Sequence, residues 1–174
     1  VLEERAMGLV RKPYGDFVKL QSEEVRKDKW KKGIELAEAD CIRKGITSFV
    51  DAGSSFEQMT WMEDMAKNKQ LKLRHWIMLR ESLGNLKANA ARLPLVNAGN
   101  GFLTAKSVKV SLDGALGSYG AWLLEPYTDR VGFMGQNTFD MDSLRAIAAF
   151  CWDNGLQLCV HAIGDRANRE TVNI

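Results

Sequence analysis

The stretch SVKVSLDG, residues 107–114, alternates apolar and polar side chains before it ends in Asp-Gly. Because successive side chains of a β-strand point to opposite faces, this pattern predicts a strand with two different faces. One face is apolar and suited to packing under helices: Val108, Val110 and Leu112. The other face carries Lys109, Ser111 and Asp113. In a parallel barrel this polar face would point inward.

Similar apolar segments recur along the chain and alternate with segments of helical periodicity. Further strands are predicted at residues 46–53, 71–79 and 156–165. Helices are predicted over 30–44, 56–68, 82–92 and 140–154, with another from Arg166 onward. Loops are expected over 93–106 and over the glycine-rich stretch 114–137. This alternation favours an α/β fold with a parallel sheet.

Four parallel strands form either a small open sheet or half of a closed barrel. The chain ends just inside a helix that follows an apolar strand, and a complete barrel usually needs roughly 250 residues. We therefore expect residues 1–174 to be the central fragment of a larger barrel domain. Within it, residues 1–29 would form a lead-in of helix and loops, and 30–174 the alternating helices and strands.

The composition excludes several classes of partner. Of the 174 residues, 45% are hydrophobic and 26% charged, and the net charge is +2. Such a small net charge attracts no nucleic acid, and no apolar run approaches the ~20 residues that cross a bilayer. We therefore expect neither a nucleic-acid nor a membrane partner. The cysteines, Cys41, Cys151 and Cys159, are far apart and form no CxxC pair, which favours reduced thiols and a cytoplasmic protein.

Lys109 and His161 are the residues that need an explanation. Both are predicted at inward positions of neighbouring strands, where burying a Lys or a His without a partner is unfavourable. The mouth of a parallel barrel lies at the carboxyl ends of its strands, and His161 and Asp113 fall near such ends. By alternation alone, however, His161 is better interpreted as a hydrogen-bonded core residue and Lys109 as a residue of an exposed edge. These patterns leave the function open.

Other polar residues have structural interpretations. His75, in the strand at 71–79, has no second signal and is predicted to be structural. Asp165 is predicted to cap the helix that begins at Arg166. Asp51 either belongs to a turn or lines the mouth.

Three motifs together resemble a known family. GITSFVDAG (45–53), VKVSLDGALGSYGAWLLEPYTD (108–129) and LQLCVHAIGDRAN (156–168) are similar to the YtcJ-like metal-dependent amidohydrolases of the amidohydrolase superfamily. The resemblance spans nearly the whole chain in the right order. It implies a closed (β/α)8 TIM barrel, to which this chain would contribute about the second to fifth strands.

The resemblance also implies a metal site. A lysine on the fourth strand of such barrels commonly carries a carbamate, formed with carbon dioxide, that bridges divalent metals, and Lys109 matches it. The fifth-strand histidine is a metal ligand, and His161 matches it. One or two divalent ions are expected, with zinc as the default. Metal-activated water would then hydrolyse a C–N bond, other than a peptide bond, in a small-molecule amide or formamide.

The remaining ligands would lie outside residues 1–174. The superfamily has an HxH pair on its first strand, a His on its sixth and an Asp on its eighth, whereas this chain has only His75 and His161. We therefore expect an enzyme in the full-length protein and no catalysis by this chain alone. Asp113 and Tyr119, which lie at and beyond the fourth-strand end, are expected to contribute to the substrate pocket. A homo-oligomer is also compatible with the sequence.

Two other functions remain open at this point. The chain could belong to a barrel relative that has lost catalysis and serves as a binding or regulatory protein. It could also bind a phosphorylated metabolite, with the glycines after Asp113 as an anion-binding nest. The phosphate-binding alternative gives the VHAIGDRA segment (160–167) no role.

Overall fold

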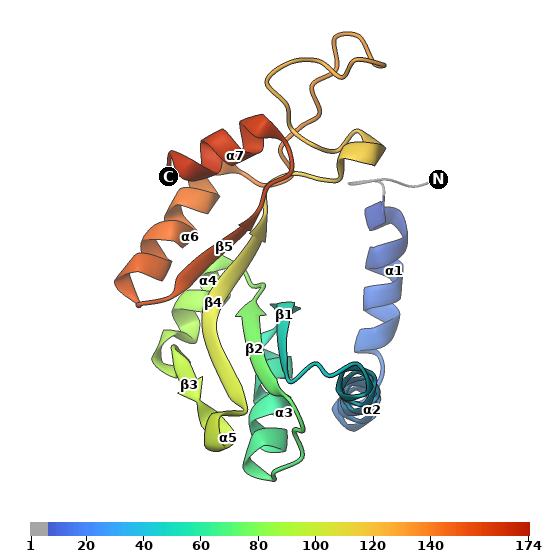
Figure 1. Ribbon diagram of the computed structural model, residues 1–174, viewed down its shortest axis with the longest axis vertical. Helices are drawn as coiled ribbons and strands as arrows, with labels where there is room; N and C mark the ends of the chain where they lie inside the picture. Colours follow the sequence, from blue (N-terminus) through green and yellow to red (C-terminus); the bar gives the residue numbers. More distant parts are fainter. Residues whose placement is uncertain (1–6) are drawn as a thin grey trace.

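The computed structural model describes residues 7–174, and its first two elements are helices (Figure 1). They are α1 (Gly8–Lys19) and α2 (Glu23–Arg43). The predicted start of α2, at residue 30, was wrong. Ser22 caps this helix, because its Oγ accepts a hydrogen bond from Val25 N, and the polar first turns carry no apolar periodicity that would have revealed them.

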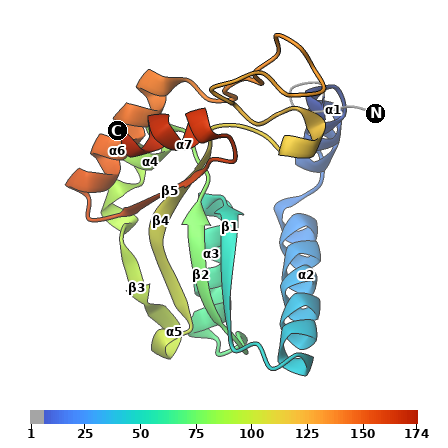
Figure 2. The same cartoon turned by 45° about the horizontal axis from the view of Figure 1, so that its top comes forward.

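An open sheet forms the centre of the fold (Figures 1 and 2). Its parallel strands lie side by side in the order β1 (Ser48–Ser54), β2 (Arg74–Leu79), β4 (Leu103–Ser111) and β5 (Gln157–His161). A short strand, β3 (Leu95–Asn97), runs antiparallel to the beginning of β4 at Ala105. The parallel sheet agrees with the predicted alternation, and its strand order is that of successive strands around an arc of a barrel.

Helices connect the parallel strands, as crossovers of this kind require. The connecting elements are α3 (Phe56–Lys67), α4 (Leu83–Ala88), η2 (Ala90–Arg92), α5 (Ala98–Gly101), η3 (Leu116–Ser118) and α6 (Met141–Asp153), and α7 (Asp165–Val172) follows β5. α3 begins with a capping box, in which Ser55 and Gln58 bond to each other's backbone N–H groups. The helices at 56–68, 82–92 and 140–154 are therefore confirmed to within a few residues.

β4 begins earlier than predicted. The strand was expected over 107–114 and the preceding segment as a loop, but β4 starts at Leu103 and β3 and α5 precede it. The chain reverses there through Asn97, Gly99 and Asn100, whose φ angles are 54°, 59° and 60°. Glycine and asparagine adopt such left-handed conformations most readily. Gly99 also lies against Ala66 of α3, where an added Cβ would stand 2.6 Å from the Ala66 Cβ.

The face of the sheet that packs under the helices is largely apolar, as the alternation around β4 predicts. The apolar side chains pack with the helices in one core cluster: Ile77, Leu79, Val108 and Val110 of the strands, Met59, Met62 and Met65 of α3, and Leu144 and Ile147 of α6. The register of β2 against β4 shifts after Ile77, where Lys106 is the extra residue of β4. Beyond this bulge, Val108 and Val110 are buried and Lys109 and Ser111 lie on the opposite face.

A buried carboxylate joins α2 to the sheet. Glu38 is 1% exposed, and its Oε1 accepts hydrogen bonds from Lys72 N at 2.9 Å and Leu73 N at 3.1 Å. The same oxygen lies 2.9 Å from His75 Nε2. This contact confirms the structural role predicted for His75, because the imidazole is buried against the helix side of β2.

Replacing Glu38 by alanine is expected to lower the free energy of unfolding by about 3 kcal/mol, because buried backbone N–H groups and an imidazole would lose their acceptor. Urea unfolding measures this change. The matched control is Glu35→Ala on the same helix, whose exposed pair with Lys32 at 3.2 Å is expected to contribute less than about 1 kcal/mol. Equal stability of the two variants would contradict the role given to Glu38.

Candidate functional site

Lys109 and His161 lie on the same face of adjacent strands. In the register of β4 and β5, Lys109 is opposite Cys159 and Ser111 is opposite His161. Since alternate residues share a face, Lys109 and His161 both line the inward face, one alternating step apart. Both side chains are partly buried. Lys109 and His161, the two metal ligands that the family resemblance implies, thus lie on one face of the sheet, near the carboxyl ends of their strands.

The amine of Lys109 has no side-chain hydrogen bond or ion pair within residues 7–174. Its neighbour across the strands is a cysteine. Burial raises the pKa of Cys159, while the charge of Lys109 and a hydrogen bond with Ser107 act to lower it. Burial also raises the pKa of Cys151 to about 11. Both thiols are therefore protonated at neutral pH.

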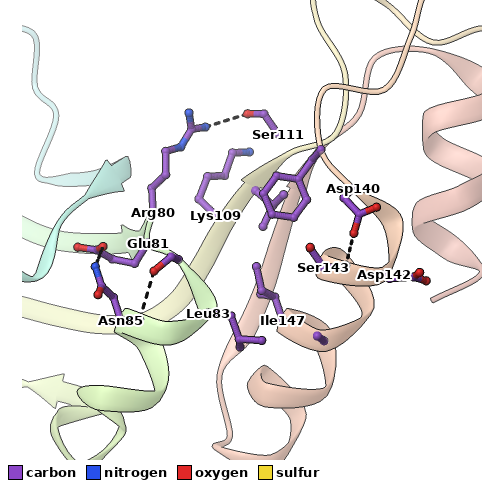
Figure 3. Close-up of a pocket in the computed structure, with 14 residues that line it drawn as sticks. Arg80, Glu81, Leu83, Asn85, Lys109, Ser111, Asp140, Asp142, Ser143 and Ile147 are labelled. Carbon is purple, nitrogen blue, oxygen red and sulfur yellow. Dashed lines mark hydrogen bonds between the residues drawn. The ribbon is translucent and has the colours of Figure 1, made fainter. Parts of the chain in front are cut away.

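A large cavity opens where β2 and β4 end, between α4 and α6 (Figure 3). This strand-end cavity has a volume of about 870 Å³. Arg80, Lys109 and Ser111 line it from the strands, and Leu83, Phe139 and Ile147 give it an apolar wall. Both a charged and an apolar part of a small molecule would find complementary groups there.

Arg80 was missed by the sequence analysis. It follows the last residue of β2, and its Nη2 donates a hydrogen bond to Ser111 Oγ at 2.8 Å (Figure 3). Trp76 precedes it on the same face and donates from Nε1 to Ser107 Oγ at 2.8 Å. Continuing the alternation from Trp76 through Met78 would have placed Arg80 on the inward face, beside Lys109.

Asp113 is a buried structural residue at the end of β4. Only 3% of it is exposed. Its Oδ1 accepts a hydrogen bond from Ile163 N at 2.9 Å, and its Oδ2 accepts from Trp122 N and Gly164 N, both at 2.8 Å. These bonds tie the loop after β4 to the turn after β5. Contact between Asp113 and a substrate stays a prediction.

Tyr119 lies in the loop after β4 and lines a different cavity, of about 370 Å³. Its hydroxyl donates a hydrogen bond to Asp129 Oδ2 at 2.8 Å. Its ring packs edge-on against Tyr127, with the centroids 5.1 Å apart. Lys109 and Ser111 line the strand-end cavity instead. A role for Tyr119 in substrate binding likewise stays a prediction.

The role predicted for Asp165 is corrected. Gly164 is the N-cap residue of α7, and Asp165 is the first residue of the helix. The Asp165 carboxylate accepts hydrogen bonds from Leu124 N at 2.9 Å and Arg166 N at 2.8 Å, so it anchors the long loop to the helix. Asp51 lies inside β1, opposite Ile77 of β2, so the turn interpretation was wrong; its carboxylate accepts a hydrogen bond from Ser54 Oγ at 2.6 Å.

The residues present fit part of a metal site. Within residues 7–174, no three His, Cys, Asp or Glu side chains lie close enough together to hold an ion. A neutral imidazole at His161 is a suitable ligand for a divalent metal, and the amine of Lys109 becomes one after carboxylation. These are two donors, and zinc usually takes four ligands. Nor does this described range contain a helix that is both long and apolar enough to span a membrane.

The fold is that of barrel-type hydrolases. It is similar to the structures of two uncharacterized metal-dependent hydrolases, from Pyrococcus furiosus (TM-score 0.76, 25% identity) and Pyrococcus horikoshii OT3 (TM-score 0.74, 21% identity). Each match covers 98% of this chain, but 35% and 34% of the respective neighbour. The likeness confirms the predicted fold class, an arc of a (β/α)8 barrel.

The sequence profile of the amidohydrolase family matches residues 2–174, and the chain belongs to that family. Among curated relatives, the protein LONG AFTER FAR-RED 3 of Arabidopsis thaliana is 25% identical over 154 residues, which are 83% of this chain and 26% of that protein. The putative amidohydrolase YtcJ of Bacillus subtilis (strain 168) is 36% identical over 67 residues, 38% of this chain and 13% of that protein. The resemblance to YtcJ-like amidohydrolases is confirmed, and the chain spans about a third or less of these relatives.

Proposed function

We propose that this chain is the central part of the barrel domain of a metal-dependent hydrolase. The bond cleaved would be a C–N bond, other than a peptide bond, in a small amide or formamide. The observation that carries the proposal is the pairing of Lys109 and His161 on one inward face at the strand ends, in a chain of the amidohydrolase family. The strand-end cavity beside Lys109 offers room for a small substrate.

Lys109 and His161 would hold the metal. The Lys109 amine, which has no hydrogen-bond partner in residues 7–174, is available to add to carbon dioxide. A new N–C bond then forms, a proton leaves the nitrogen, and an anionic carbamate results. His161 would bind as neutral imidazole. A divalent ion, zinc by default and one or two in number, would supply a hydroxide near neutral pH and polarise the carbonyl of the amide.

This chain by itself is expected to be inactive. Lys109 and His161 would occupy two ligand positions, and the others would come from the rest of the full-length protein. The apolar wall of the strand-end cavity, with Leu83 and Phe139, would hold the organic part of the substrate and exclude water from it.

Lys109→Ala and His161→Ala test the proposal in the full-length protein. Each variant is expected to lose bound metal, measured by elemental analysis, and to lose at least about 100-fold of the hydrolysis of an N-substituted formamide, because each removes a direct ligand. Lys106→Ala is the matched control, since Lys106 is an exposed lysine of the same strand. Unchanged metal and rate in the Lys109 and His161 variants would refute the site and favour a non-catalytic relative.

A further inference from the structure

We propose that Arg80 binds a carboxylate group of the substrate at the mouth of the strand-end cavity. This inference rests on the proposed function, since it assumes that the cavity receives the substrate. It names the class of substrate: an amide that also carries a carboxylate next to an apolar group.

Arg80 bridges the ends of neighbouring strands. Leu79 is in register with Val108, so Arg80 comes next to Lys109 on the inward face. Its guanidinium bonds to Ser111, which lies opposite His161 in the register of β4 and β5. On the other side lies β1, where a Cβ added to Gly53 would stand 3.8 Å from the Arg80 Nε. The guanidinium is thus held at the carboxyl ends of the strands, above Lys109 (Figure 3).

The carboxylates of the strand-end cavity are already engaged by local partners. Glu81 accepts from Phe56 N and Asn85 Nδ2, both at 2.9 Å, Asp140 accepts from Ser143 N at 2.8 Å, and Asp142 pairs with Arg145 at 2.9 Å. No carboxylate within residues 7–174 forms an ion pair with Arg80 or Lys109. The charges of Arg80 and Lys109 are therefore not paired with a carboxylate of the described residues, although Glu81, Asp140 and Asp142 line the same cavity.

This arrangement differs from that of other arginines of the chain. Arg26, Arg43, Arg92 and Arg145 each pair with a carboxylate. Arg80 instead donates one hydrogen bond to a neutral hydroxyl, that of Ser111. A guanidinium has five N–H groups in a planar fork, so further donors remain. The bond to Ser111 fixes the orientation of that fork, and the remaining donors match the two oxygens of a carboxylate.

A metal-bound carbamate on Lys109 would not satisfy this charge. The carbamate would serve as a ligand of the metal, and Arg80, which is exposed and lines the cavity, would keep its unpaired charge. Phe139 and Leu83 line the same cavity and would contact an aryl or alkyl group attached to the carboxylate. Phenylacetate, in which one methylene group joins a carboxylate to an aromatic ring, has both features, and phenylacetamide is its neutral counterpart.

Calorimetric titration of the full-length protein with phenylacetate tests the proposal. The protein is first treated with EDTA and then dialysed free of it, so that neither a metal nor the chelator, itself a polycarboxylate, competes for the ligand. The wild type is expected to bind phenylacetate about tenfold more tightly than phenylacetamide, and Arg80→Gln is expected to lose that preference. Arg80→Lys keeps the charge without the fork and should fall in between. Arg74→Gln, at the exposed opposite end of β2, should behave as the wild type.

The outcome separates this inference from the proposed function. If the wild type shows no preference for phenylacetate, or if Arg80→Gln keeps that preference, the carboxylate site is wrong, whatever the metal content. If the preference depends on Arg80 but Lys109→Ala and His161→Ala retain metal and hydrolysis, the carboxylate site stands and the proposed metal centre fails.

Discussion

Asp113→Ala is expected to lower the free energy of unfolding by about 3–5 kcal/mol, because the Asp113 carboxylate is the shared acceptor for the N–H groups of Trp122, Ile163 and Gly164. Charge-assisted hydrogen bonds of this kind contribute about 1.5–3 kcal/mol each when a partner is left unsatisfied. Alanine would leave these three N–H groups without an acceptor, at a position where the native Asp113 is only 3% exposed. Water could enter only by separating the loop after β4 from the turn after β5.

Two further variants make the test sharper. Asp113→Asn keeps the shape but replaces one acceptor oxygen with a donor, so its loss should be about half as large as that of alanine. Asp129→Ala removes a carboxylate of the same loop that is exposed and bonds the Tyr119 hydroxyl, and it should change stability by less than about 1 kcal/mol. Urea unfolding of the full-length protein measures all of them. If Asp113→Ala were no worse than Asp129→Ala, the carboxylate would have no structural role.

The faces of the strands could be predicted because alternation is a local property. The pattern around Lys109 and His161 needs only neighbouring residues, and the register of β4 and β5 brings these residues to one face. The helix–strand order was predicted for the same reason. Family membership then followed from motifs whose residues are contiguous, and it is confirmed by the match over residues 2–174.

Features that depend on contacts distant in sequence could not be predicted. The early start of β4 goes with its pairing to β2, in which Leu103 lies opposite His75. The sequence around Glu38 is typical of a solvent-exposed helix position. Its burial depends on hydrogen-bond partners that lie 34 to 37 residues further along the chain.

The same distinction applies to the site. Arg80 lies one residue beyond its strand, and its hydrogen-bond partner is 31 residues away. Asp113 was placed correctly at a strand end, but its bonds to Ile163 and Gly164 span about 50 residues. Alternation predicts the direction of a side chain, whereas the groups that it meets there depend on the register of other strands and on the path of loops.

Gly164→Ala is expected to destabilise the protein by at least about 3 kcal/mol, because the position has no room for a methyl group. A Cβ on Gly164 would stand 1.9 Å from the carbonyl oxygen of Trp122, 2.4 Å from its carbonyl carbon and 2.7 Å from its nitrogen. These are backbone atoms, so no change of rotamer relieves the clash. Trp122 is also held, since its N–H donates to Asp113 and its carbonyl accepts from Ala167 N at 3.2 Å.

The matched control is Gly117→Ala in the loop after β4, where an added Cβ meets nothing within 4 Å, and it should change stability by less than about 0.5 kcal/mol. Gly164 has a φ of −66°, which alanine adopts freely, so the difference between the variants isolates the steric clash. The double variant Asp113→Ala/Gly164→Ala should lose less stability than the sum of the single losses. Once Asp113 releases Trp122, the loop can move away from the new methyl group, and the coupling in a double-mutant cycle would measure how far these residues act as one clamp.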